Sequence, residues 1–364
     1  MSTSSVKLLS LIVTSIATAF SLTSLAGSTA SKSAALSIPE ASLPPPTLSK
    51  VKPPKGNPRI SDDRISEEEL ARLPDPQQAP DLKKYIQDLQ VGSLEQRIEL
   101  LKKQSLKHLI FVQGGTFTMG DFTPLLKIPG VSRMTYNEDD KHLHKVTLSD
   151  FYINRYKTTN AELNVFLDAT KQPRRDPNDK QRNYEPGVPA GATWHTAESY
   201  CQWLGKLNSH TFSLPTEAQW EYAARSRGQF FMAPTDNGEI LFGKNVPYSK
   251  QAKRLAAGGY GTWHAIGLFP ANPLGLYDMT TNGQEWVSDW YAEDAYQHHE
   301  STDPQGPKQG DKKVTRGWSL DTLKIGVSVW RRNLNPLGRT KSWQGEETTR
   351  PLVLMPSIRC VAQR

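Results

Sequence analysis

The sequence predicts a loop-rich α+β domain that is preceded by short helices. The run LIFVQGGTFTMGD, residues 109–121, is typical of a short β segment that a Gly-Gly turn interrupts. Few later segments have the apolar spacing of a helix, and long stretches rich in glycine and proline separate them up to a closing strand, PSIRCVAQR. No repeat or low-complexity block interrupts residues 108–364, so we expect one domain there.

Residues 1–26 have the pattern of a signal peptide. Lys7 precedes the apolar run LLSLIVTSIATAF, which is too short to span a membrane. Ser24 and Ala26 are small residues at the positions that a signal peptidase requires, and Gly27 follows where a lipid anchor would need a cysteine. We therefore expect a secreted protein of a bacterial periplasm that is not lipidated and has no membrane span in its mature chain.

Two further segments precede the domain. Residues 27–60 are rich in serine and proline and cannot bury enough apolar area to offset the entropy of ordering, so we predict a disordered tether. Residues 61–107 are predicted to form short amphipathic helices, because Ser66 precedes an acidic first turn and Ser93 with Gln96 has a capping-box pattern. These helices pack either on the main domain or on a partner.

Within the domain, the local patterns predict strands and helices in order. Residues 144–170 are expected to form two strands and a helix that begins after a cap at Thr159 or Asn160. Thr216 precedes Glu217 at another expected helix start. Between these, residues 194–208 form a predicted helix with one apolar face, made of Ala197, Tyr200, Cys201 and Leu204.

The composition is that of a soluble globular protein, with 37% hydrophobic and 22% charged residues in a chain of 364. The net charge of +7 is modest for this length, and acidic residues lie among the basic ones. Because no basic stripe suits a phosphate backbone, we expect no nucleic-acid partner.

The chain contains two cysteines, Cys201 and Cys360. In an oxidising compartment such a pair commonly forms a disulfide, although two buried thiols are equally compatible with the spacing.

Seven sequence blocks together indicate a family. In chain order they are FVQGGTFTMGD, HKVTLSDFYINRYKTTNAEL, WHTAESYCQWLGKL, LPTEAQWEYAAR, NPLGLYDMTTNGQEWVSDWY, VTRGWS and IRCV. This series resembles the formylglycine-generating, or sulfatase-modifying-factor, domain family over roughly residues 108–364. The resemblance implies an irregular, loop-rich α+β fold related to C-type lectins. It also implies a disulfide between Cys201 and Cys360, which match a cysteine pair that family members often join.

The resemblance also defines what this chain lacks. In the sulfatase-modifying enzymes, two reactive cysteines follow an Arg-Gly-Gly-Ser turn and bind copper, which needs soft thiolate ligands. The matching stretch here, residues 319–332, contains no cysteine, and Trp318 replaces the second glycine of the turn. We therefore expect no copper site and no formylglycine-generating activity.

A second metal is implied at the turn in DMTTNGQEWVSDWY. Family members often bind calcium there, and Asn282, Gly283 and Glu285 match the residues concerned; carboxylate, amide and carbonyl oxygens are the ligands that calcium prefers. The alternative is that Glu285 merely accepts backbone N–H groups. His142 and His144 alternate along an expected strand and could share a face, but such a pair is more often a solvated edge.

The stretch VTRGWSLDTLKIGVSVWRRN combines arginines with tryptophans, which suits recognition by bidentate donors beside flat apolar surfaces. A serine without a positioned histidine is no nucleophile, so we predict no catalytic residue here. The alternative is that the tryptophans form core and the arginines an ion-paired rim. The candidates for a binding pocket are Trp286, Arg316, Trp318, Ser319, Asp321, Trp330, Arg331, Arg332 and Asn333.

Taken with the resemblance, these features predict a periplasmic pseudoenzyme that binds a protein partner. One role known in the family fits this prediction, that of a periplasmic regulator upstream of the threonine-kinase pathway of type VI secretion. A related role is that of an immunity-type protein that neutralises a periplasmic toxin. The alternative is a periplasmic oxidoreductase of the same family, of the kind that matures siderophores, which also lacks the cysteine pair.

Overall fold

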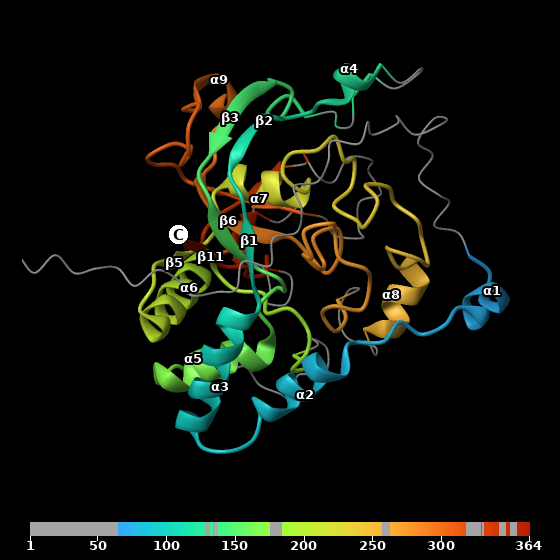
Figure 1. Ribbon diagram of the computed structural model, residues 1–364, viewed down its shortest axis with the longest axis vertical. Helices are drawn as coiled ribbons and strands as arrows, with labels where there is room; N and C mark the ends of the chain where they lie inside the picture. Colours follow the sequence, from blue (N-terminus) through green and yellow to red (C-terminus); the bar gives the residue numbers. More distant parts are fainter. Residues whose placement is uncertain are drawn as a thin grey trace, which may run out of the picture. The chain divides into compact units, whose positions relative to one another are not determined.

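The computed structural model describes residues 65–127, 132–133, 135, 137–174, 184–256, 263–317, 329, 331–341, 347–349 and 355–364 (Figure 1). The predicted signal peptide and tether lie outside these residues. The chain divides into two units, Met1–Leu36 and Ser37–Arg364, and every element described below belongs to the second. None of the helices in the described ranges has the length and apolar character needed to cross a bilayer.

Three helices precede the first strand: α1 (Glu67–Arg72), α2 (Pro80–Asp88) and α3 (Leu94–Lys107). The predicted capping box at Ser93 is confirmed, and Ser66 caps α1 in the same way, which satisfies backbone N–H groups that a helix start leaves free. The hydroxyl of Tyr85 in α2 donates to Glu162 Oε1 at 2.8 Å. Arg97 in α3 forms an ion pair with Asp168 at 2.7 Å. Thus α2 and α3 pack on the domain.

Within the described residues the named strands pair in antiparallel ladders, and the sheets are small. The largest has the order β1-β4-β11-β5, with β1 at Leu109–Val112, β4 at Phe151–Asn154, β11 at Val361–Gln363 and β5 at Phe212–Ser213. The C-terminal strand β11 therefore lies inside this sheet. A separate ladder joins β2 (Gly115–Met119) to β3 (His144–Leu148).

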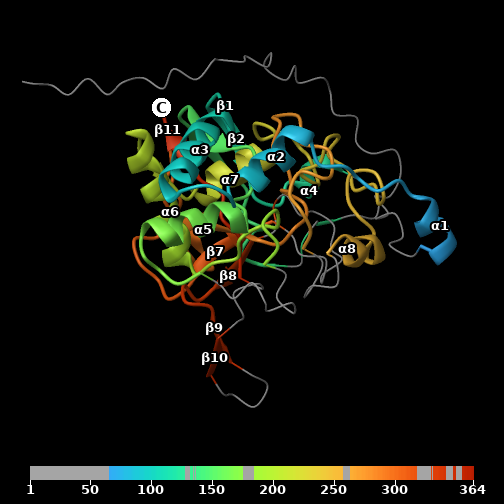
Figure 2. The same ribbon diagram turned by 90° about the horizontal axis from the view of Figure 1, so that it is seen from below.

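A three-stranded sheet has the order β6-β7-β8, formed by Glu285–Trp290, Lys313–Arg316 and Arg331–Leu334. The two strands that follow β8, β9 (Arg339–Lys341) and β10 (Glu347–Thr349), form a ladder of their own that extends away from β8 (Figure 2). This division into small sheets joined by long loops confirms the predicted loop-rich α+β class.

The remaining helices are α4 (Thr123–Leu126), α5 (Asn160–Ala169), α6 (Trp194–Asn208), α7 (Glu217–Ala224), α8 (Ser249–Leu255) and α9 (Ala295–His298). Thr159 is the N-cap of α5, because its hydroxyl accepts the N–H of Glu162; this decides between the two caps that the sequence left open. Thr216 caps α7 as predicted.

Helix α7 occupies the centre of the domain (Figure 1). It contacts β2 and β3 as well as β6 and β7, so it lies between two sheets, and all of its residues are buried. Trp220 and Ala223 belong to the main hydrophobic cluster, together with Phe151 and Val314 from two different sheets. A helix that is surrounded in this way can place charged side chains only where partners exist to neutralise them.

The predicted disulfide between Cys201 and Cys360 is present, with Cα atoms 5.6 Å apart. It joins α6 to the segment immediately before β11. Because β11 pairs with β4 and β5, this bond fastens the C-terminal strand inside the largest sheet.

Candidate functional site

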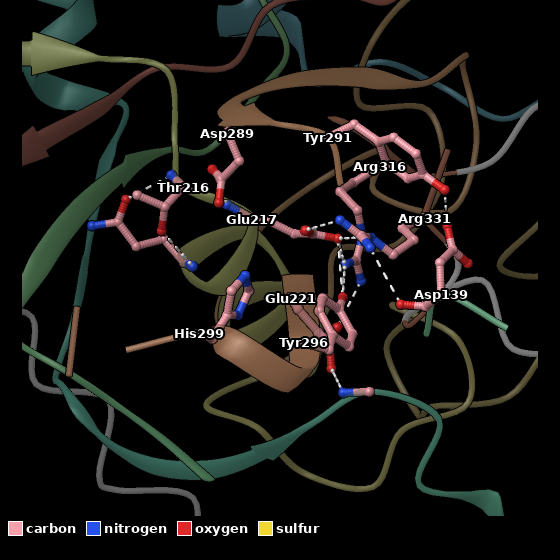
Figure 3. A network of polar contacts seen from close by, with 12 residues as sticks. Asp139, Thr216, Glu217, Glu221, Asp289, Tyr291, Tyr296, His299, Arg316 and Arg331 are labelled. Atoms are coloured by element: carbon pink, nitrogen blue, oxygen red, sulfur yellow. Dashed lines mark hydrogen bonds and ion pairs between the residues drawn. The ribbon is translucent and has the colours of Figure 1, made fainter. Parts of the chain in front are cut away.

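A buried network of arginines and carboxylates lies where α7 meets the three-stranded sheet (Figure 3). Arg316, the last residue of β7, donates to Glu217 Oε1 at 2.7 Å and to Glu221 Oε2 at 2.8 Å. Arg331, the first residue of β8, donates to the two oxygens of Glu217 at 2.9 and 3.0 Å. These four side chains are fully buried.

The strand register explains why the carboxylates are needed. Arg316 and Arg331 are cross-strand partners in the β7–β8 ladder. Like charges opposite one another destabilise a ladder, so both guanidinium groups require anions beside them. Glu217 and Glu221 lie four residues apart on one face of α7, and Arg225 follows on that face and pairs with Glu221 at 2.7 Å. The helix thereby fixes the two strands through charge-assisted hydrogen bonds.

The arginines also fix the charge of Glu217. Burial alone would raise the pKa of Glu217, but Arg331 and Arg316 outweigh this effect and hold the pKa at about 2. Asp289 is the opposite case. Its Oδ2 accepts the backbone N–H of Glu217 at 2.8 Å, and burial together with the neighbouring Glu217 charge raises its pKa to about 7. Glu217 is therefore ionised at neutral pH, whereas Asp289 titrates near neutral pH.

Histidines approach the same network from its edge. His144 in β3 and His299 after α9 face each other, with Nε2 of the first 3.1 Å from Nδ1 of the second. Burial lowers the pKa of His299 to about 4. The second residue of the sequence pair, His142, is exposed, and its carbonyl oxygen contacts Nδ1 of His144. The ring of His144 therefore contacts His299 instead of pairing with His142 as a metal ligand.

Glu217, Asp289 and His299 bring possible metal-ligand atoms within 4.8 Å of one another. Arg331 binds both oxygens of Glu217, however, and Arg316 and the hydroxyl of Tyr296 also donate to Oε1. A metal ion would have to displace these donors and add charge beside two guanidinium groups. The trio does not fit a metal site.

The pocket candidates from the sequence separate into three groups. Trp286, Arg316 and Arg331 are buried within the domain, and Trp286 donates from Nε1 to the carbonyl of Ala192 at 2.7 Å. Arg332 and Asn333 alternate with the buried residues of β8 and are partly exposed, so they stay candidates for recognition. The others lie outside the described residues: Trp318, Ser319, Asp321 and Trp330.

The ammonium group of Lys157 lies in the turn that was predicted to bind calcium. Lys157 Nζ donates to the carbonyl oxygens of Thr281, Asn282 and Gly283 at 3.0, 3.1 and 2.5 Å. It also lies 3.6 Å from Glu285 Oε1. The residues of this turn therefore do not fit the calcium ion that the resemblance implied, because an ammonium group already stands among its oxygens.

The cysteines bear on the copper chemistry of the sulfatase-modifying enzymes. The two cysteines of the chain bond to each other, so neither provides the thiolate that copper(I) requires.

The sequence did not point to the residues that organise the arginine–carboxylate network and the turn before β6. These residues are Glu217 and Glu221 in the network and Lys157 at the turn. A signal for the first two was available, because glutamates four residues apart inside the apolar segment LPTEAQWEYAAR predict charges on a buried helix face. No local signal marks Lys157, because its partners lie more than a hundred residues further along the chain.

The fold and this site define a loop-rich α+β domain of small antiparallel sheets, built around a buried arginine–glutamate helix. Residues 95–346 match the model of the sulfatase-modifying factor enzyme 1-like domain, and the chain belongs to this family. The match begins inside α3.

The relatives of the chain include enzymes and much longer proteins. The serine/threonine-protein kinase pkn1 of Chlamydia pneumoniae is 29% identical over 261 residues, which are 66% of this chain and 37% of the kinase. The formylglycine-generating enzyme of Bos taurus is 25% identical over 262 residues, which are 58% of this chain and 65% of the enzyme. The chain therefore spans less than two thirds of the length of these relatives.

Among solved structures, PvdO from Pseudomonas aeruginosa superposes with a TM-score of 0.50 and 25% sequence identity. The match covers 70% of this chain and 94% of that one. This agreement supports the family fold.

Proposed function

We propose that this protein is a periplasmic, non-lipidated binding module of the sulfatase-modifying-factor family that recognises a protein partner and generates no formylglycine. The observation that carries the proposal is the Cys201–Cys360 disulfide, which engages both cysteines of the chain. Without a thiolate, the family's copper chemistry has no ligand and no reactive sulfur.

The state of the arginines supports a scaffold at the centre of the domain. Arg316 and Arg331 donate hydrogen bonds to Glu217 and Glu221. These bonds hold β7 and β8 in place against α7. Recognition then falls to the partly exposed positions of β8, Arg332 and Asn333. An arginine at an interface contributes most where its partner is desolvated with it.

The secreted location rests on the signal-peptide pattern of residues 1–26, and a disulfide is typical of proteins from an oxidising compartment. A regulatory role agrees with the kinases that share this domain, because the shared region is 37% of the C. pneumoniae protein and is therefore a module within it. We favour a regulator of the threonine-kinase pathway of type VI secretion over an immunity-type protein for this reason.

The enzymatic part of the proposal is tested with a cysteine-containing sulfatase peptide and added copper(I). Mass spectrometry should show no conversion of the peptide cysteine, whereas a formylglycine-generating enzyme converts it under the same conditions. Copper-dependent conversion by the purified protein would overturn the proposal. Oxidation of a siderophore precursor or another peptide would instead favour the oxidoreductase alternative.

The binding part is tested with two matched variants in the native bacterium. Arg332→Ala with Asn333→Ala should abolish complementation of a deletion strain while the purified variant keeps the wild-type melting temperature. A matched change at an exposed position of another sheet, Lys145→Ala, should complement fully. Full complementation by the β8 variant would place recognition elsewhere, with α2 and α3 as the next surface to test.

A further inference from the structure

Three consecutive carbonyl oxygens point at one cation in the turn before β6. They belong to Thr281, Asn282 and Gly283, and Lys157 Nζ is their common donor. Asn282 and Gly283 have φ values of 62° and 85°, in the left-handed region. Two features exclude a side chain at Gly283. Its φ of 85° disfavours any residue with a Cβ, and a Cβ there would lie 2.6 Å from the ring of Trp263.

The charges around this turn are already balanced. Glu285 accepts from Arg359 at 2.8 and 2.9 Å and from Trp220 Nε1 at 2.8 Å. Lys157 and Arg359 thus face Glu285, and Asp278 contributes a further negative charge to Lys157. Two cations and two carboxylates sum to zero, so a divalent ion would add two uncompensated charges to a buried site.

The Asn282 amide is also engaged. Its Oδ1 accepts the backbone N–H of His264 at 2.9 Å, and its Nδ2 donates to the carbonyl oxygen of His264 at 3.1 Å. The side chain therefore fastens the preceding loop and directs no oxygen to the cation. Calcium takes about six to eight oxygen ligands. This turn offers the three carbonyls and one shared carboxylate to Lys157.

We propose that Lys157 is a built-in cation that takes the place of a calcium ion in this turn, so the domain folds around it without calcium. Lys157 is fully buried and lies between β4 and α5, and its ammonium group joins this segment to the start of β6. A lysine has three donors, and three carbonyl oxygens accept them here. The lysine thereby gives the turn the positive charge that its oxygens require, as part of the chain.

The proposal makes opposite predictions for the wild-type protein and for a variant in which the lysine becomes an oxygen ligand. The melting temperature of the wild-type protein should be the same in millimolar calcium and in excess chelator. Lys157→Glu replaces the internal cation by a third carboxylate, so it should be strongly destabilised in chelator and should regain stability with calcium. Lys157→Met removes the charge but offers no oxygen, so calcium should not stabilise it.

Terbium(III), which binds calcium sites, gives a direct measurement of binding. Trp220 and Trp263 adjoin the turn, so a terbium ion bound there would emit on excitation of tryptophan. Lys157→Glu should show saturable emission with a stoichiometry of one, which calcium abolishes by competition. The wild-type protein and the exposed control Lys145→Glu should show none.

Stoichiometric calcium or terbium binding to this turn in the wild-type protein would overturn the proposal, whether or not any variant folds. A folded Lys157→Glu protein that binds neither ion would also overturn it, because the carbonyls would then not form a cation site. If Lys157→Glu folds only in the presence of calcium, that dependence itself supports the proposal. None of these results depends on the partner-binding function.

Discussion

Arg331 at the start of β8 forms a bidentate ion pair with Glu217 at the start of α7, with N–O distances of 2.9 and 3.0 Å. The two residues are 114 positions apart in the chain, and both side chains are fully buried. The same carboxylate accepts a hydrogen bond from Arg316 on the neighbouring strand. One glutamate therefore ties the central helix to two strands.

Glu217→Gln should lower the free energy of unfolding by about 3–5 kcal/mol at neutral pH, because removal of one partner leaves buried charges uncompensated. Chemical denaturation measures this change. Glu293→Gln, at an exposed position, is the control and should change the free energy by less than about 0.5 kcal/mol. A Glu217→Gln protein as stable as the control would mean that the arginines find other partners.

Arg331 and Arg332 are neighbours in the sequence but should behave differently on substitution. Arg331→Ala should destabilise the fold by about 3–5 kcal/mol, because Glu217 loses a bidentate partner. Arg332 is partly exposed, so Arg332→Ala should change stability by less than about 1 kcal/mol. Thermal melting of the two variants side by side checks this prediction, and equal destabilisation would contradict it.

Loss of the disulfide should destabilise the protein through the unfolded state. Cys201 and Cys360 are 159 positions apart, and a closed loop of this size contributes about 4–5 kcal/mol in the chain-entropy model. The double change Cys201→Ala with Cys360→Ala should lower the free energy of unfolding accordingly. Reducing agent should destabilise the wild-type protein but leave the double variant unaffected, and non-reducing peptide mapping should recover the bonded pair.

The raised pKa of Asp289 predicts that the free energy of unfolding falls as the pH rises. Its pKa is raised from 3.8 to about 7 in the folded protein by burial and by the Glu217 charge, so the folded state holds a proton that the unfolded state releases. Its contribution to stability is therefore lost as the pH rises from about 4 to about 7. Asp289→Asn keeps an oxygen for the Glu217 N–H and carries no charge.

The Asp289→Asn protein should consequently be more stable than wild type at pH 8, by the order of 2–4 kcal/mol, and similar to it at pH 4. Urea denaturation across this pH range gives the comparison. The opposite trend, a variant that is less stable at pH 8 than at pH 4 relative to wild type, would show that Asp289 is ionised in the folded protein.

Much of the fold could be predicted because its signals are local. The caps at Ser93, Thr159 and Thr216 depend on residues three positions away, and the predicted helices begin where those caps lie. The family resemblance supplied the long-range part that local patterns lack, namely the Cys201–Cys360 bond and the absence of copper-binding thiols.

The site was predicted less well because the sequence shows residue types but not their partners. The arginines of β7 and β8 were compatible with a recognition pocket or with an ion-paired rim, and the turn of Asn282 and Glu285 with a calcium site or with a carboxylate that only accepts N–H groups. In the folded protein α7 presents Glu217 to Arg331, and the loop after β4 presents Lys157 to the turn 126 positions beyond it.

The sequence by itself therefore determined the family, the cysteine pairing and the starts of the helices, since these follow from short-range patterns or from a series of recognisable blocks. Only the tertiary structure decided which charges meet. A buried charge is stable only beside an opposite charge or a set of oxygens, and packing brings these together from distant parts of the chain.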